Sequence, residues 1–272
     1  MLNDTVFMIR DGTFGSGFEQ KLIFSLIAVG LCFIDWCENN KRKDYFWVFL
    51  FGTIIWTAAE FLQQLSGVRE MDAGTLWGLQ IPLFFSLILQ GAFEGAFIAI
   101  WGLFAADRLI SRDKRKKIIG IITWSGYTIY AVIGTLFQMK SAKDVGGDVA
   151  SRRNMLAPMA IIFLVSILAL DIIWMWRCGN NTKRKRILVF YLSMMIFAAI
   201  WTMSEFIANT RWIEVGIIIS STRAEPFVEF LALTWDVTVE IAAAYVPFLI
   251  IPYILKLVSN QSIEKIEEKK EI

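Results

Sequence analysis

The residues of this sequence with the clearest chemical potential are carboxylates that lie inside long apolar stretches. A charged side chain in the middle of a bilayer costs about 2.5–3.5 kcal/mol on insertion scales, so acids without a role are rare there. A carboxyl group in such surroundings can give a proton to a substrate or remove one from it. The acids concerned are Glu60, Glu94, Asp171, Glu205, Asp236 and Glu240, with Glu229 nearer the end of a stretch.

The spacing of these acids predicts helix faces that they share with amides and aromatic rings. Two faces repeat a tryptophan, a glutamate and an amide at intervals of four residues, namely Trp56, Glu60 and Gln64, and Trp201, Glu205 and Asn209. Two more faces carry Gln90 with Glu94, and Glu229 with Asp236 and Glu240. At about 1.5 Å per residue, the glutamates at 60, 94, 205 and 240 lie about 18–27 Å from the basic ends of their helices. We therefore expect four helices to direct carboxylates into one layer.

The composition is typical of a polytopic membrane protein. Of the 272 residues 56% are apolar, with 11 Trp and 22 Phe, and the mean hydropathy is +0.55. No histidine is present, which excludes a histidine-bound zinc ion and a Ser-His-Asp triad. The three cysteines show no CxxC spacing, and a net charge of +2 gives no reason to expect nucleic acid. We expect no metal and no other cofactor.

Seven stretches are long enough to cross about 30 Å of hydrocarbon. They are 22–37, 45–63, 80–106, 118–138, 155–176, 187–209 and 226–256. Eighteen of the 27 basic residues lie in the loops at 38–44, 107–117 and 177–186 or from Lys256 onward. The positive-inside rule then predicts an outside N-terminus and a cytoplasmic C-terminus in a multi-pass protein of the cell membrane. Asp35 and Asp107, at the basic ends of their spans, are interpreted as solvated caps.

A short motif occurs twice and indicates an internal duplication. Residues 55–61 and 200–206 read Ile-Trp-Thr-Ala-Ala-Glu-Phe and Ile-Trp-Thr-Met-Ser-Glu-Phe, five identities in seven at an offset of 145. Three spans per copy and one linking span predict an all-α, 3+1+3 architecture with parallel repeats about an axis along the membrane normal. The expected parts are an outer segment 1–21, repeat one 22–106, a linker with span four 107–154, repeat two 155–256 and a cytoplasmic tail 257–272.

Two small-residue and proline patterns predict local features of the spans. Gly91 and Gly95 form a GxxxG pair, which favours close packing of span three on a neighbouring helix. Pro247 and Pro252 predict a kink or a local interruption in span seven, because proline lacks the N–H that an unbroken helix needs.

Three kinds of function suit a layer of carboxylates. The first is acid–base chemistry on an apolar substrate, in which one carboxyl protonates a double bond, another removes a proton, and aromatic faces stabilise a cation between the two steps. The second is a proton- or cation-coupled carrier of small molecules, with Trp56, Trp201 and Trp235 as walls of the site between the repeats. The third is an oxygen-ligand site for a hard divalent cation, which no sequence signature singles out.

Part of the second repeat resembles the integral-membrane lycopene cyclases. The residues concerned are Glu205-Phe206, then Arg211-Trp212, then Pro226-Phe227-Val228-Glu229-Phe230. The Trp56-to-Glu60 face and Asp236 are also similar to the acids of membrane-embedded terpene cyclases. The resemblance implies a seven-span plan of duplicated three-span units and an isoprenoid-handling acid–base enzyme. Val228 stands where the lycopene cyclases have the first glutamate of a pair, so the resemblance does not extend to lycopene as the substrate.

We therefore expect a cyclase or isomerase that acts without a cofactor on a membrane lipid or isoprenoid, with the carrier as the alternative. The expected acid–base residues are Glu60, Glu94, Glu205, Asp236 and Glu240. The expected substrate-binding residues are Trp56, Gln64, Gln90, Trp201, Asn209, Arg211, Glu229 and Trp235, with Arg211 and Glu229 near the entrance. Since basic residues are expected only at loop ends, the crowded acids are expected to hold and exchange protons. The sequence is also compatible with assembly of the chain into a homo-oligomer.

Overall fold

The computed structural model describes residues 5–10, 18–71, 74–138, 151–217 and 221–258. The rest of the expected outer segment, 1–4 and 11–17, and most of the expected tail, 259–272, lie outside the described residues. The described part contains seven helices, two of which include a π-helical segment, labelled η. The helices are α2 (Glu19–Glu38), α3 (Asp44–Leu65), α4–η1–α5 (Leu83–Gln90, Gly91–Phe97, Ile98–Ile110), α6 (Lys114–Gln138), α7 (Pro158–Arg177), α8 (Asn181–Ile207) and α9–η2–α10 (Pro226–Trp235, Asp236–Ala243, Pro247–Ile254).

Six of these helices are long and apolar enough to cross a membrane, which suggests a multi-pass membrane protein. The helix that falls outside this group is α2, which carries Glu19, Lys21 and Asp35. The expected first span, 22–37, lies within α2. By length and composition, six of the described helices could therefore cross a membrane, and the seventh span stays a prediction.

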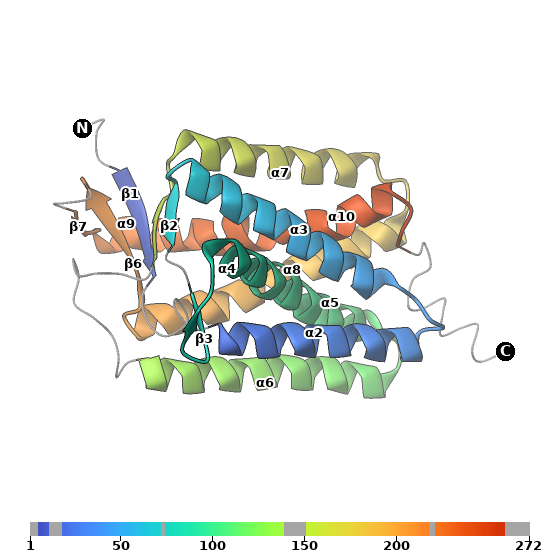
Figure 1. Cartoon of the computed structure of the whole chain (residues 1–272). Coiled ribbons are helices and arrows are strands. Elements are labelled where there is room, and N and C mark those ends of the chain that lie inside the picture. Colours follow the sequence, from blue (N-terminus) through green and yellow to red (C-terminus); the bar gives the residue numbers. More distant parts are fainter. Residues whose placement is uncertain (1–4, 11–17, 72–73, 139–150, 218–220, 259–272) are drawn as a thin grey trace.

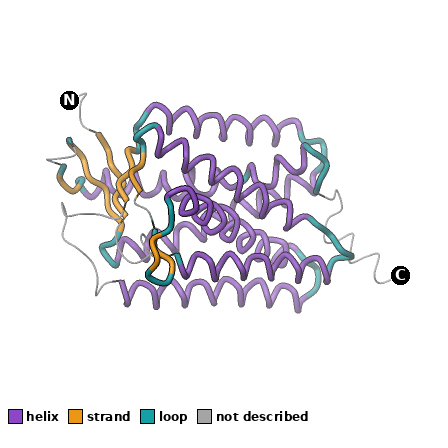
Figure 2. Tube along the Cα trace, in the orientation of Figure 1, coloured by secondary structure: helices purple, strands orange, loops and turns teal. Residues whose placement is uncertain are grey.

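A five-stranded antiparallel sheet covers one end of the helices in the described part of the chain, and the all-α prediction did not include it. Its order is β2 (Arg69–Met71), β5 (Ser151–Asn154), β1 (Thr5–Arg10), β6 (Arg211–Gly216) and β7 (Thr222–Arg223), beside a small hairpin of β3 (Thr75–Leu76) and β4 (Leu79–Gln80). Figure 1 shows the strands gathered at the end where the N-terminus lies, with the C-terminus at the opposite end. We call these the sheet end and the loop end. Figure 2 separates the strands from the helical body by colour.

The register of the sheet aligns arginines on one face. Arg10 of β1 lies opposite Arg211 of β6, and Arg69 of β2 lies opposite Arg153 of β5. Met8 pairs with Arg153, so alternation along β1 places Met8 and Arg10 on the same face. Like charges directly opposite each other destabilise a sheet, so this face requires anionic partners. The other face carries the apolar cluster of Phe7, Ile9 and Trp212.

Close packing of η1 on α3 confirms the prediction from the GxxxG pair. A side chain at Gly91 would collide with Thr57, and one at Gly95 would collide with the carbonyl group of Gly52. Within the last helix, the expected interruption lies between η2 and α10, where Pro247 begins α10. Proline is favourable at the first helical position because its missing N–H has no partner there in any case.

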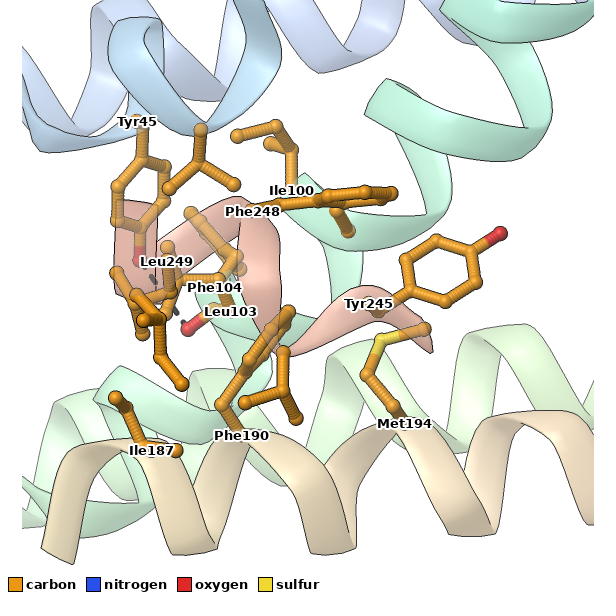
Figure 3. Packing of buried hydrophobic residues seen from close by; sticks show 14 of the residues in the cluster. Tyr45, Ile100, Leu103, Phe104, Ile187, Phe190, Met194, Tyr245, Phe248 and Leu249 are labelled. Carbon is orange, nitrogen blue, oxygen red and sulfur yellow. Dashed lines mark hydrogen bonds between the residues drawn. The ribbon is translucent and has the colours of Figure 1, made fainter. Parts of the chain in front are cut away.

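The apolar core fills the bundle between the middle and the loop end (Figure 3). It is built from facing side chains of α3, α5, α8 and α10, among which Leu103, Phe190, Met194 and Phe248 are fully buried. Tyr245 lies at the edge of this core nearer the sheet end. A close-packed core of this kind separates the two ends of the molecule.

Two parts of the chain follow the same order of elements. The first runs β1, α2, α3, β2 and α4–η1–α5, with the hairpin β3–β4 inserted before α4. The second runs β5, α7, α8, β6 and α9–η2–α10, with the short strand β7 inserted before α9. Both parts interrupt the third helix with a π-helical segment, and α6 joins the two parts. Short π segments within α-helices are frequent at functional sites.

Candidate functional site

Carboxylates and arginines form a buried layer where the helices meet the sheet. The acids come from α3, η1, α8 and η2, and the arginines come from β1, β2, β5 and β6. We call this layer the sheet-end cluster. Its members are Glu60, Glu94, Glu205, Asp236 and Glu240 with Arg10, Arg69, Arg153 and Arg211.

Two arginines join acids from different helices. Arg10 donates to Glu94 Oε1 at 3.2 Å and to Glu205 Oε1 at 3.0 Å. Arg211 donates through Nε to Glu205 Oε2 at 2.6 Å, and it also binds Asp236. Three of the expected acids, from η1, α8 and η2, are thus held by two strand arginines. Arg211 lies inside the cluster, only 2% exposed, and not near an entrance.

Glu60 and Glu240 share a distinct pattern of contacts, because each accepts hydrogen bonds from an arginine and from an indole. Arg69 donates to Glu60 at 2.6 Å, and Trp56 Nε1 donates to the same carboxylate at 3.1 Å. Arg153 binds Glu240, while Trp235 Nε1 donates to it at 3.2 Å. Arg153 also donates to Asp236 Oδ1 at 3.1 Å. Each of these two carboxylates is therefore held in one orientation by two donors.

The arginines change the expected electrostatics of the acid layer. Cations were expected only at loop ends, yet four guanidinium groups reach the layer from the sheet. Burial acts to lower the pKa of Arg10, but Glu205 and Glu94 outweigh it and raise that pKa above its ordinary value. The pKa of Arg153 is raised in the same way, against burial, by Glu240 and Asp236. The acids therefore face permanent positive charges.

A cavity of about 310 Å³ lies directly beneath the sheet-end cluster. Its walls are mainly apolar and aromatic, and they include Trp56, Trp201, Phe93, Phe163, Tyr127 and Tyr245. Four acids and four arginines line its polar end, and their formal charges cancel. These are Glu60, Glu94, Asp236 and Glu240 with Arg10, Arg69, Arg153 and Arg211. Such a combination of apolar walls with a few convergent polar groups is typical of a small-molecule site.

The cavity reaches the side of the bundle between α3 and α7. Leu62 of α3 and Met159 and Ile162 of α7 line it, yet they are 50–59% exposed. Only Leu164 and Ile167 of α7 are buried, because this helix lies at the edge of the bundle (Figure 1). This side of the cavity therefore lies at the exposed surface of the bundle.

Several expected site residues lie outside the cavity lining. Gln90 accepts a hydrogen bond from the buried Lys21 at 2.7 Å, and Asn209 accepts one from Arg223 at 2.8 Å. Arg223 also pairs with Glu229 at 3.2 Å. Gln64 and Asp171 are half-buried on α3 and α7, and Trp235 contributes only by orienting Glu240. Glu205 belongs to the cluster but does not line the cavity.

Sequence reasoning missed Arg10, Arg69 and Arg153. Each lies in a strand of no more than six residues, and none belongs to an apolar span. A weak signal was present in β1, where Phe7 and Ile9 alternate with Met8 and Arg10.

A second charged group is buried at the loop end, where solvated caps were expected. Asp35 and Asp107 are each only 1% exposed, so the interpretation as caps is wrong. Arg186 donates to Asp107 at 2.7 and 2.8 Å, and Arg42 donates to Asp35 at 2.6 Å. Burial and Arg186 act to lower the pKa of Arg42, but three aspartates raise it above its ordinary value. We call Asp35, Arg42, Asp44, Asp107 and Arg186, with Tyr45 and Tyr253, the loop-end cluster.

Within the described ranges, no three acidic or cysteine side chains are grouped so that they could hold a metal ion. In the sheet-end cluster, arginines stand between the carboxylates, which is unfavourable for a divalent cation.

No protein-family model matches this sequence, and neither a curated protein nor a solved structure matches it at a significant level.

Proposed function

We propose that this chain is a membrane enzyme that performs acid–base chemistry, a cyclisation or an isomerisation, on a lipid or isoprenoid without a cofactor. The observation that carries the proposal is the position of Glu60 and Glu240. Both carboxylates line one apolar cavity, and both are held by an indole and an arginine. Fixed acids at the end of an apolar pocket are the groups that proton transfer to a hydrocarbon requires.

The proposed reaction moves one proton onto the substrate and another proton off it. The carboxyl of Glu60 or Glu240, in its acid form, donates a proton to one carbon of a C=C bond and leaves a carbocation. The ring faces of Trp56, Trp201 and Tyr245 line the cavity and stabilise that positive charge. The other carboxylate then removes a proton from a neighbouring carbon, which closes a new double bond. The product has the mass of the substrate. The carboxyl that took up a proton releases it to solvent, and the carboxylate that donated one takes a new proton from solvent, which restores the enzyme.

The proposal includes the seven-span, 3+1+3 plan with an outside sheet end and a cytoplasmic loop end. The repeated order of elements supports the duplication. So do the matching ion pairs, since Glu60 binds the first residue of β2 and Glu205 binds the first residue of β6. Positions 8 and 153 differ by the offset of the motif, 145 residues, and they lie in β1 and β5, the first strands of the two parts.

Comparison of membrane lipids with and without the cavity carboxylates tests the proposal. Wild-type protein in the organism's own membranes should deplete one lipid and form an isomer of equal mass. Glu60→Gln and Glu240→Gln should let the precursor accumulate. Glu229→Gln is the matched control, because Glu229 is buried and paired but lies outside the cavity. Lipid profiles that are the same for the wild type and both cavity variants would refute the enzyme.

The carrier remains the second candidate because the ion pairs of the two parts correspond, and many transporters are built from related repeats with the substrate site at their interface. It needs a route from the cavity to the loop end. The described lining stops at Ile98 and Tyr245, beside the apolar core. Uptake of a small organic cation into proteoliposomes, abolished by Glu60→Gln, would favour the carrier over the enzyme.

A further inference from the structure

The linking helix α6 occupies a position that bears on how a ligand reaches the cavity. Tyr130 of α6 packs against Phe24 of α2, with ring centroids 5.3 Å apart. One turn earlier, Tyr127 packs on Phe197 and lies 6.2 Å from Trp201, both on α8. The helix α6 therefore bridges α2 and α8. Figure 1 shows it along α2, on the side of the bundle opposite α7.

The duplicated order of elements gives this position its meaning. The open side of the cavity lies between α3, the second helix of the first part, and α7, the first helix of the second part. If the two parts are exchanged, α3 corresponds to α8 and α7 corresponds to α2. The place that corresponds to the open side is therefore between α8 and α2. There Tyr127 lines the cavity and is only 6% exposed, whereas Leu62 and Ile162 on the open side are 52% and 59% exposed.

The size of the cavity limits how much of a lipid it can hold. At about 310 Å³, the cavity is at the lower end of the range of about 300–1,000 Å³ that small-molecule pockets span. A lipid or isoprenoid with a long chain is larger than such a pocket, so we expect part of its chain to lie outside. The apolar side chains of Leu62, Met159 and Ile162 continue from the cavity to the surface between α3 and α7.

We propose that the groove between α3 and α7 binds the hydrocarbon chain of the ligand and is the single entrance to the cavity, because α6 closes the related groove between α2 and α8 with Tyr127. This rests on the proposed function, in which the ligand is a membrane lipid or isoprenoid. The linking helix α6 thus leaves the cavity open on the side of α3 and α7 and closed on the related side of α2 and α8.

Photolabelling of the full chain in lipid nanodiscs with a diazirine analogue of geranylgeraniol tests the entrance. Crosslinks that unlabelled geranylgeraniol competes away should map to residues 59–66 of α3 and 159–166 of α7. Ala160→Trp, in the cavity lining, should reduce this labelling at least tenfold. Val165→Trp is the matched control, because Val165 lies on the same helix, exposed and outside the lining, and it should leave labelling unchanged.

A second variant tests the role of α6. Tyr127→Ala should add competable crosslinks on α2 and α8, while Ile129→Ala, at an exposed position of α6, should add none. Competable labelling on α2 and α8 in the wild-type chain, or no new labelling in Tyr127→Ala, would overturn the single entrance and leave the proposed function intact. No competable labelling anywhere in the wild-type chain would overturn both.

Discussion

The sheet-end and loop-end clusters contain the same kinds of groups but differ in the space beside them. Each brings carboxylates from several helices to buried or half-buried arginines, with hydrogen bonds such as those of 2.6–3.0 Å at Arg10, Arg186 and Arg211. The sheet-end cluster lines a cavity of about 310 Å³, whereas none of the loop-end residues lines it. Tyr45 and Tyr253 contact the loop-end charges and also belong to the apolar core.

This difference separates two uses of buried charge. An ion pair surrounded by packed side chains holds helices in register but has no access to a ligand. An ion pair at a cavity wall can meet a substrate, and its donors fix the orientation of the carboxylate that reacts. Changes at the loop end should therefore act on folding, and changes at the cavity should act on conversion of the ligand.

The largest expected effect is on stability, at the loop end. Arg186→Met leaves Asp44 and Asp107 with only the guanidinium of Arg42, and removal of one partner of a buried pair destabilises by about 3–5 kcal/mol. Denaturant unfolding in detergent, followed by circular dichroism, measures the loss. The control is Lys185→Met, at the exposed neighbouring position. If Arg186→Met does not fold, Arg186→Lys, which keeps the charge, should show a smaller loss. Equal stability of all three variants would refute the structural role.

The next effect is on catalysis and compares two glutamates at matching places of the duplicated motif. Glu60→Gln should lower the conversion rate at least about a hundredfold, as loss of a general acid or base does. Glu205→Gln should lower it by a much smaller factor, because Glu205 does not line the cavity. The measurement is the rate at which each variant converts the isolated lipid. Equal losses of rate in both variants would show that Glu60, in the cavity, and Glu205, outside it, do not differ in role.

Neighbouring arginines of β5 offer a third comparison. Arg153 reaches Asp236 and Glu240, whereas Arg152 binds Glu214, which is fully buried and outside the cavity lining. A hydrogen bond to a charged group contributes about 1.5–3 kcal/mol, so Arg153→Met should reduce kcat roughly ten- to a hundredfold. Arg152→Met should change thermal stability and leave kcat unaltered. A loss of kcat in Arg152→Met, with kcat unaltered in Arg153→Met, would contradict the assignment of Arg153 to the site.

The smallest effect is expected at Asn209, a predicted ligand-binding residue that lies in neither cluster. Its φ of 56° is in the left-handed region, where glycine is readily accepted. Asn209→Gly loses one exposed hydrogen bond with Arg223, so stability should change by no more than about 0.5 kcal/mol. Geranylgeraniol-competable labelling should be unchanged, and a tenfold loss would return Asn209 to the site.

The helices were largely predictable from the sequence because hydrophobic length and basic loops mark them directly. The largest error in a helix boundary is at α8, expected to begin at 187 and observed to begin at Asn181, where Asn180 caps the helix through its side chain. The sheet was not predictable in the same way. Its strands are two to six residues long, and their partners lie far away in the sequence, as Phe7 and Glu214 do.

In the candidate site, too, the residues on helices were predictable and most of those on strands were not. Periodicity identified the carboxylates of the cluster, since they interrupt apolar helices at regular intervals. Arg211 was among the expected site residues, but the other three arginines that bind these acids come from strands, where long-range pairing leaves at most a weak local signal. Asp35 and Asp107 show the opposite failure. Their position at the ends of spans predicts solvated side chains, but tertiary packing buries both with Arg42 and Arg186.

Incorporation of solvent hydrogen into the lipid tests the central claim most directly. If Glu60 and Glu240 transfer protons to and from a double bond, the product formed by wild-type protein in D₂O should carry one deuterium on carbon. Glu60→Gln and Glu240→Gln should incorporate none, and Glu229→Gln should match the wild type. If the product that the wild-type protein forms in D₂O carries no deuterium on carbon, the acid–base account is contradicted.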